Sequence, residues 1–131
     1  MEDSIFTKII KGEIPCHKIY EDEKTIAFLD IHPQTPGHTL VVPKAQVDHI
    51  WDLDDEEYGH LMRTVKRVGQ RLRQFTDRKR VGVIVAGYGV PHTHVHLIPM
   101  KDEAELKAFQ NLDSPVDQDA LSRIAQELSF Q

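Results

Sequence analysis

The chain has 131 residues, and its 16 lysines and arginines against 21 aspartates and glutamates give a formal net charge of −5. A hydrophobic fraction of 40 % with 28 % charged residues suits one globular core and excludes collagenous, disordered and disulfide-framework proteins. The single Cys16 cannot form an internal disulfide, no segment approaches the roughly 20 apolar residues of a membrane span, and the acidic N-terminus is unlike a signal peptide. We therefore expect a single domain over residues 1–131 in a cytoplasmic protein that binds neither membranes nor nucleic acid.

The first half of the chain predicts one short helix and three strands. Residues 4–11 are typical of a helix with Ser4 as N-cap. Residues 17–20 and 25–29 predict two strands joined by a polar turn, and residues 38–43 predict a third strand that ends at a proline.

The second half predicts the longest helix and two more strands. The helix begins near Asp54. Its apolar stripe is formed by Tyr58, Leu61, Val65, Val68, Leu72 and Phe75. Residues 81–86 and 92–98 predict strands on either side of a glycine-rich loop. The pattern indicates an α+β fold with a five-stranded antiparallel sheet, one long helix and short flanking helices.

We expect residues 1–100 to form the core of this domain and residues 101–131 to form a C-terminal extension. The extension contains an amphipathic helix after the cap Asp117, with an apolar stripe at Leu121, Ile124, Ala125 and Leu128. That stripe packs either on its own subunit or on the partner in a dimer.

Three histidines stand at alternate positions in the last predicted strand. His92, His94 and His96 would share one face at a spacing of roughly 6–7 Å, with Val95 and Leu97 on the opposite face. One histidine in a strand is usually a structural residue, but three in a row are an unusual choice for a core because each buried imidazole needs its own partners.

Two kinds of site use such a row. In a metal site, histidines two apart bind one Zn²⁺, but the sequence offers no paired cysteines and no acidic ligand within the strand, and such a site would be inhibited by chelators. In a phosphate site, imidazoles donate hydrogen bonds to phosphoryl oxygens while one of them attacks phosphorus.

The row and three further segments resemble the histidine triad (HIT) family, in particular its Hint-like branch of nucleotide hydrolases. The matching segments occur in the same order and are residues 4–15, 27–31, 36–44 and 92–98. The resemblance implies the HIT-like fold, with the five-stranded sheet of each subunit continued across a homodimer. It also implies a nucleotide substrate and no cofactor.

The resemblance further implies a role for each histidine. His94 would be the nucleophile that attacks the α-phosphate of a nucleotide and forms a nucleotidyl-histidine, which water then hydrolyses. His96 and His38 would hydrogen-bond the phosphate, and His92 would lie beneath the site and hold its strand. A neutral imidazole is a competent nucleophile at pH 7, which agrees with this assignment.

The same resemblance implies the residues that bind the nucleoside. Asp30 would accept hydrogen bonds from the ribose hydroxyls, with an Asx turn as its alternative role. The apolar slot for the base would be formed by Ile5, Phe6, Ile9, Phe28 and Ile31. Plain core packing is the alternative role for these apolar side chains.

Two departures from the family pattern limit the comparison. Many bacterial members bind a structural zinc through two cysteines and a histidine together with the first triad histidine, but this chain has Ser4, Thr7 and Gln46 at those positions, so we expect no metal. The loop before the triad, residues 87–91, is short and lacks polar side chains that contact phosphate in many Hint-like proteins.

We therefore expect a nucleotide hydrolase or transferase that acts on purine nucleoside monophosphate derivatives of the phosphoramidate or adenylyl type. One alternative is a diadenosine polyphosphate hydrolase of the Fhit-like branch. The other is a nucleotide-binding module with weak catalysis, which the short loop permits.

Overall fold

The computed structural model describes residues 2–106 and 115–130, so residues 107–114 of the expected C-terminal extension lie outside the described residues. The elements in chain order are α1 (Ile5–Ile10), β1 (Lys18–Glu21), β2 (Thr25–Leu29), β3 (Thr39–Pro43), the 3-10 helix η1 (Ile50–Asp52), α2 (Asp55–Phe75), β4 (Arg80–Ile84), β5 (Val95–Met100), the 3-10 helix η2 (Glu103–Leu106) and α3 (Gln118–Leu128). No helix within the described ranges is long and apolar enough to cross a membrane.

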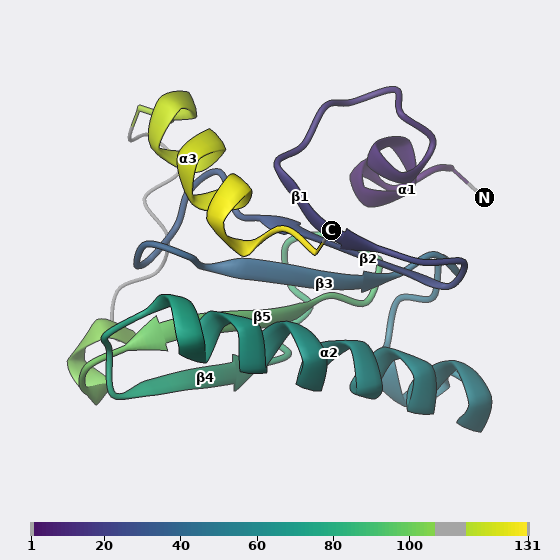
Figure 1. Ribbon diagram of the computed structural model, residues 1–131. Helices are drawn as coiled ribbons and strands as arrows, with labels where there is room; N and C mark the ends of the chain where they lie inside the picture. Colours follow the sequence, from purple (N-terminus) through teal and green to yellow (C-terminus); the bar gives the residue numbers. More distant parts are fainter. Residues whose placement is uncertain (1, 107–114, 131) are drawn as a thin grey trace.

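The five strands form one antiparallel sheet in the order β1-β2-β3-β5-β4, as Figure 1 shows. The long helix α2 contacts β2, β3, β4 and β5, and α3 contacts β1, β2 and α2. The expected five-stranded antiparallel sheet with one long helix is confirmed.

Alternation along the central strands divides the apolar side chains between the two faces of the sheet. In β2, Ala27 and Leu29 join the larger core cluster, which includes residues of α2 and α3, whereas Ile26 and Phe28 join a smaller cluster with Phe6 of α1. Both β2 and β3 are buried along their whole length, because each face is covered by a helix. The face that carries α1 is also the face that carries the histidines.

Helix α3 packs on the sheet of its own chain. Asp117 caps it by accepting a hydrogen bond from the backbone N–H of Ala120 at 3.0 Å. Leu121, Ala125 and Leu128 are buried in the larger cluster. The apolar stripe is therefore used within the subunit, which decides one alternative that the sequence left open.

The last strand begins later than the sequence predicts. We expected strand from residue 92, but β5 starts at Val95, so His92 and His94 lie on the extended approach to it. The pairing of β3 with β5 ends where Val41 lies opposite Val95. Before that point, Thr93 donates both its backbone N–H and its hydroxyl to the carbonyl of Val47, each at 2.7 Å. The approach is thus held by the loop after β3.

Tyr58, the first residue of the predicted apolar stripe on α2, is more exposed than we expected. Tyr58 is 38 % exposed, whereas Leu61, one turn later, is fully buried. In Figure 1 the first turns of α2 extend beyond the ends of β4 and β5. They contact the turn between β1 and β2 through polar side chains, since Lys24 bonds to Glu56 and His60 to Asp22.

Candidate active site

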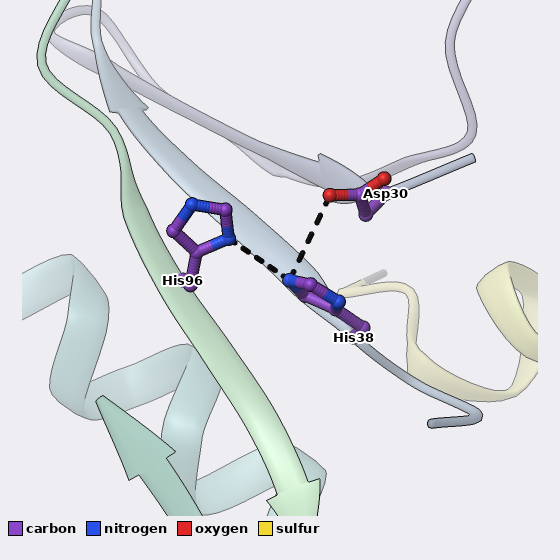
Figure 2. Close-up of side chains that lie close together, drawn as sticks. All are labelled: Asp30, His38 and His96. Atoms are coloured by element: carbon purple, nitrogen blue, oxygen red, sulfur yellow. Dashed lines mark hydrogen bonds and ion pairs between the residues drawn. The ribbon is translucent and has the colours of Figure 1, made fainter. Parts of the chain in front are cut away.

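Three strands bring Asp30, His38 and His96 together. Asp30 follows β2, His38 precedes β3 and His96 lies in β5, and the three side chains point toward one another in Figure 2. The Nε2 atom of His38 lies 2.9 Å from Nδ1 of His96 and 3.7 Å from Oδ2 of Asp30. Because β3 lies between β2 and β5, residues that are far apart in the chain meet at one end of the sheet.

The hydrogen bonds assign a proton to each of these rings. The backbone N–H of Gln34 donates to Nδ1 of His38 at 3.1 Å, so the proton of neutral His38 is on Nε2. That proton is donated to Nδ1 of His96. The proton of His96 is then on Nε2, where it can be donated to a substrate oxygen. His38 therefore acts through His96 in this arrangement.

His94 is oriented by the backbone of the neighbouring triad residue. Its Nδ1 lies 2.8 Å from the carbonyl oxygen of His92, and since a carbonyl only accepts, Nδ1 carries the proton. The lone pair is therefore on Nε2, as a nucleophilic imidazole requires. The ring of His94 lies 5.1 Å from that of His96 and packs edge-on against Phe6 at 5.0 Å.

His92 is fully buried, and both of its ring nitrogens make hydrogen bonds. Its Nε2 donates to the carbonyl oxygen of Pro43 at 2.7 Å, which leaves Nδ1 to accept the hydroxyl proton of Ser4 at 2.6 Å. This position agrees with the expectation that His92 holds the strand rather than contacts substrate.

Burial favours the neutral form of His38, His92 and His96. It lowers the pKa of His96 to about 4, with smaller contributions from the neighbouring rings of His38 and His94. Burial also lowers the pKa of His38, partly opposed by the carboxylate of Asp30. The pKa of His92 is lowered by burial as well, against the carbonyl of Pro43. The rings therefore serve as neutral donors and acceptors.

The described residues contain one group with the spacing of metal ligands. One ligand atom each of Asp30, His38 and His96 lies within 4.8 Å of the others. However, the bond from Gln34 to Nδ1 of His38 places a proton on Nε2, the atom that a metal would need. The two histidines are therefore arranged as a hydrogen-bond chain from Gln34 through His38 to His96, with the carboxylate of Asp30 beside it at 3.7 Å.

The three positions occupied by zinc ligands in many bacterial family members do meet beside His92. Thr7 Oγ1 lies 2.6 Å from Oε1 of Gln46, and Ser4 Oγ lies 2.6 Å from the ring of His92. These side chains offer hydroxyl and amide oxygens, which suit Zn²⁺ poorly compared with thiolate and imidazole, and they bond to one another.

The residues expected to bind the nucleoside fall into two groups. Phe6 and Phe28 are buried with ring centroids 5.7 Å apart and belong to the smaller core cluster, and Ile9 packs against that cluster. In contrast, Ile5 is 48 % exposed and Ile31 is 44 % exposed. The first group packs in the core, whereas Ile5 and Ile31 present apolar surface to solvent.

Asp30 uses one carboxylate oxygen locally. Its Oδ1 accepts the backbone N–H of His32 at 2.8 Å, which is the Asx turn considered above, and its Oδ2 faces His38. The turn fixes the carboxylate beside the imidazoles, so the structural and the functional role are compatible.

Sequence reasoning missed the partners that orient the histidines. His38 is held by the backbone N–H of Gln34, and His92 by the carbonyl of Pro43. Ser4 is held by the side chain of Gln46. Ser4 carried the signal of a helix cap, and Ser4 and Gln46 were otherwise singled out only as positions that hold zinc ligands in many family members. A backbone amide or carbonyl has no signature in the sequence.

Comparison with known proteins places this arrangement in a family. A family profile described as HIT domain matches residues 11–103, which contain Asp30, His38 and all three triad histidines. The chain belongs to the HIT family. Its match to the family profile starts after α1, so Ser4 and Phe6 lie outside the matched range.

Relatives in the HIT family extend the similarity over most of the chain. An uncharacterized HIT-like protein of Borreliella burgdorferi is 39 % identical, covering 76 % of each chain. A protein of Schizosaccharomyces pombe named adenosine 5'-monophosphoramidase hnt1 is 32 % identical, covering 95 % of each chain. The crystal structure of a HIT-like protein from Bartonella henselae has a TM-score of 0.83 at 30 % identity and covers 96 % of this chain and 93 % of its own.

Proposed function

We propose that this HIT protein is a nucleotide hydrolase that cleaves a substituent from the α-phosphate of a purine nucleoside monophosphate derivative, with His94 as covalent nucleophile. The observation that carries the proposal is the hydrogen bond from Nδ1 of His94 to the carbonyl of His92, because it leaves the lone pair on Nε2. The phosphoramidase name of the S. pombe relative supports an amine as the leaving group.

In the first step, the Nε2 lone pair of His94 attacks phosphorus and forms a new P–N bond. The bond from phosphorus to the leaving amine breaks, and the amine departs with that electron pair and one proton from solvent. The Nε2–H group of His96 donates to a phosphoryl oxygen and stabilises the charge that develops there. His38 fixes His96 in the tautomer that can donate.

In the second step, water attacks phosphorus, the bond to His94 breaks, and the nucleoside monophosphate and a proton are released. Throughout both steps Nδ1 of His94 keeps its proton and its bond to the carbonyl of His92. The adduct therefore carries a positive imidazole ring, which is a good leaving group. Asp30 would bind the ribose hydroxyls, and Ile5 and Ile31 would cover the base.

The test is mass spectrometry of protein quenched without acid during turnover of an adenosine phosphoramidate. We expect a nucleotidyl adduct on His94. The variant His94→Ala should lose at least about 1,000-fold in kcat while it still binds AMP, and His49→Ala, at an exposed histidine outside the site, should behave as the wild type. Unchanged turnover in His94→Ala would exclude the mechanism, and AMP binding without turnover in the wild type would indicate a binding module.

We also propose that the protein forms the homodimer implied by the family, through the free edge of β4. This strand ends the sheet, and Val83 and Val85 beside that edge are 55 % and 42 % exposed. The opposite edge, β1, is partly covered because Phe130 donates its backbone N–H to the carbonyl of Ile19 at 3.0 Å. The cytoplasmic location stays a prediction.

A further inference from the structure

The hydroxyl of Ser4 joins α1 to the triad. It accepts the backbone N–H of Thr7 at 3.0 Å, as the N-cap of α1, and it lies 2.6 Å from Nδ1 of His92, 88 positions away in the chain. Ser4 is 7 % exposed and His92 is fully buried, so water does not compete for this bond. A helix cap needs only the acceptor function of serine, which leaves its proton for the histidine.

The protons of the surrounding groups are all accounted for. Nε2 of His92 donates to the carbonyl of Pro43, so its Nδ1 must accept from Ser4. The hydroxyl of Thr7 donates to Oε1 of Gln46 at 2.6 Å, and the same oxygen accepts the backbone N–H of Ser4 at 2.8 Å. Gln46 in turn donates its amide to the carbonyl of Glu2 at 2.7 Å. Each of these hydrogen bonds therefore has a defined donor and a defined acceptor.

This cluster continues to the nucleophile through the backbone. The ring of His92 is fixed at both nitrogens, and the carbonyl of the same residue accepts the Nδ1 proton of His94 at 2.8 Å. Phe6 strengthens the link, since its ring packs edge-on against both His92 at 5.8 Å and His94 at 5.0 Å. A shift of His92 would therefore move the acceptor that fixes the tautomer of His94.

We infer that Ser4, supported by Thr7 and Gln46, is a positioning residue that sets the orientation and tautomer of the nucleophile His94 by way of His92. The inference rests on the proposed function and adds residues to it. The hydrogen bonds of Ser4, Thr7 and Gln46 lead to His92 and to the backbone of Glu2, so we expect their effect to be on the attack by His94.

The test is the variant Ser4→Ala with steady-state kinetics on an adenosine phosphoramidate. Without the hydroxyl, Nδ1 of His92 loses its donor at 2.6 Å, and the hydroxyl of Thr7, 3.4 Å away, already donates to Gln46. The ring can then take the other tautomer, which ends its bond to the carbonyl of Pro43. We expect kcat to fall by about 10- to 100-fold with little change in KM or in AMP affinity. Ser4→Thr, which keeps the hydroxyl, should restore most of the activity.

Two further variants separate positioning from stability. Asp54→Ala removes the N-cap of α2, which makes the same type of bond to the N–H of Glu57, and should lower stability without changing kcat. Thr7→Val keeps the side-chain shape and removes the bond to Gln46 at 2.6 Å together with the longer contacts to Ser4 and His92, but it leaves the bond from Ser4 to His92 in place, so a smaller loss in kcat is expected. Equal kcat in Ser4→Ala and the wild type would overturn the inference, as would a loss that parallels the loss of AMP binding.

Nitrogen-15 spectra of the histidine rings test the inference even if the protein is not an enzyme. In the wild type, His94 should be protonated at Nδ1 and His92 at Nε2. In Ser4→Ala both signals should change toward a mixture of tautomers, whereas in Asp54→Ala they should not. Unchanged spectra in Ser4→Ala would reject the positioning role, while absent turnover in the wild type with altered spectra would reject only the proposed function.

Discussion

Three of the four site histidines, His38, His92 and His94, have their protons assigned by a backbone group, and His96 has its proton assigned by the ring of His38. Gln34 donates to His38, and the carbonyls of Pro43 and His92 accept from His92 and His94. Backbone groups cannot exchange donor for acceptor, so they fix tautomers more firmly than a hydroxyl or water would. The same burial that protects these bonds lowers the pKa of His96 to about 4 and lowers those of His38 and His92.

Stability should therefore fall with acidification. An unfolded histidine has a pKa near 6.5, so below that pH the unfolded chain takes up protons that folded His96 binds only near pH 4. The stabilising contribution is complete above about pH 6.5 and is lost as the pH falls toward about 4. For partly exposed His96 we expect a loss on the order of 1 kcal/mol between about pH 7 and about pH 5.

Urea denaturation followed by circular dichroism at a series of pH values measures this loss. The variant His96→Gln should show a smaller decrease in unfolding free energy than the wild type. His49→Gln is the matched control, because the His49 side chain is 72 % exposed. Identical pH dependence in His96→Gln and the wild type would contradict the expectation.

The helices differ in how they are held. Helix α1 has only six residues and is capped by Ser4, so its position depends on tertiary contacts such as that of Phe6 with the triad. Helix α2 has 21 residues, three acidic residues in its first turn and a cap at Asp54. Helix α3 contributes three buried side chains to the larger core cluster.

Removing the last of these side chains should cost much of the stability. Leu128→Ala leaves a cavity in the larger cluster, where Leu128 is fully buried, and we expect a loss of about 2–5 kcal/mol in unfolding free energy. Gln126→Ala, at an exposed position of the same helix, should change it by less than about 0.5 kcal/mol. Urea denaturation of the two variants measures the difference, and a small effect of Leu128→Ala would show that α3 is dispensable to the core.

The two edges of the sheet differ at the scale of the whole molecule. The β1 edge carries the hydrogen bond from Phe130, whose ring also packs against Tyr20 at 5.1 Å and lies under the guanidinium of Arg71 at 4.7 Å. The β4 edge carries exposed valines instead. No strand among residues 2–106 and 115–130 pairs with the outer side of β4, so a second copy of the chain could extend the sheet there.

A charge at that edge should therefore produce monomers. Val83→Glu places a carboxylate in the expected interface, where it would lose hydration without a partner. Light scattering after size-exclusion chromatography should give about twice the chain mass of 15.1 kDa for the wild type and the single chain mass for this variant. Val83→Thr has a similar shape and should remain dimeric. A dimeric Val83→Glu variant would place the interface elsewhere.

Local patterns in the chain predicted the order of the strands and α-helices, most of their bounds and the row of histidines. Strand Thr25–Leu29 and the caps Ser4, Asp54 and Asp117 were predicted as found, because periodicity and capping are local properties of the chain. The alternation that places Val95 and Leu97 opposite His96 is local as well.

Which residue orients each histidine depends on contacts between distant parts of the chain. The bond of Ser4 to His92 spans 88 positions and that of His38 to His96 spans 58, so both depend on strand order and register rather than on neighbouring residues. The later start of β5 has the same origin, because it follows from where the pairing with its partner strand ends. Local patterns indicate which side chains share a face of the sheet. Hydrogen bonds between distant parts of the chain determine which ring nitrogen of each histidine keeps its proton.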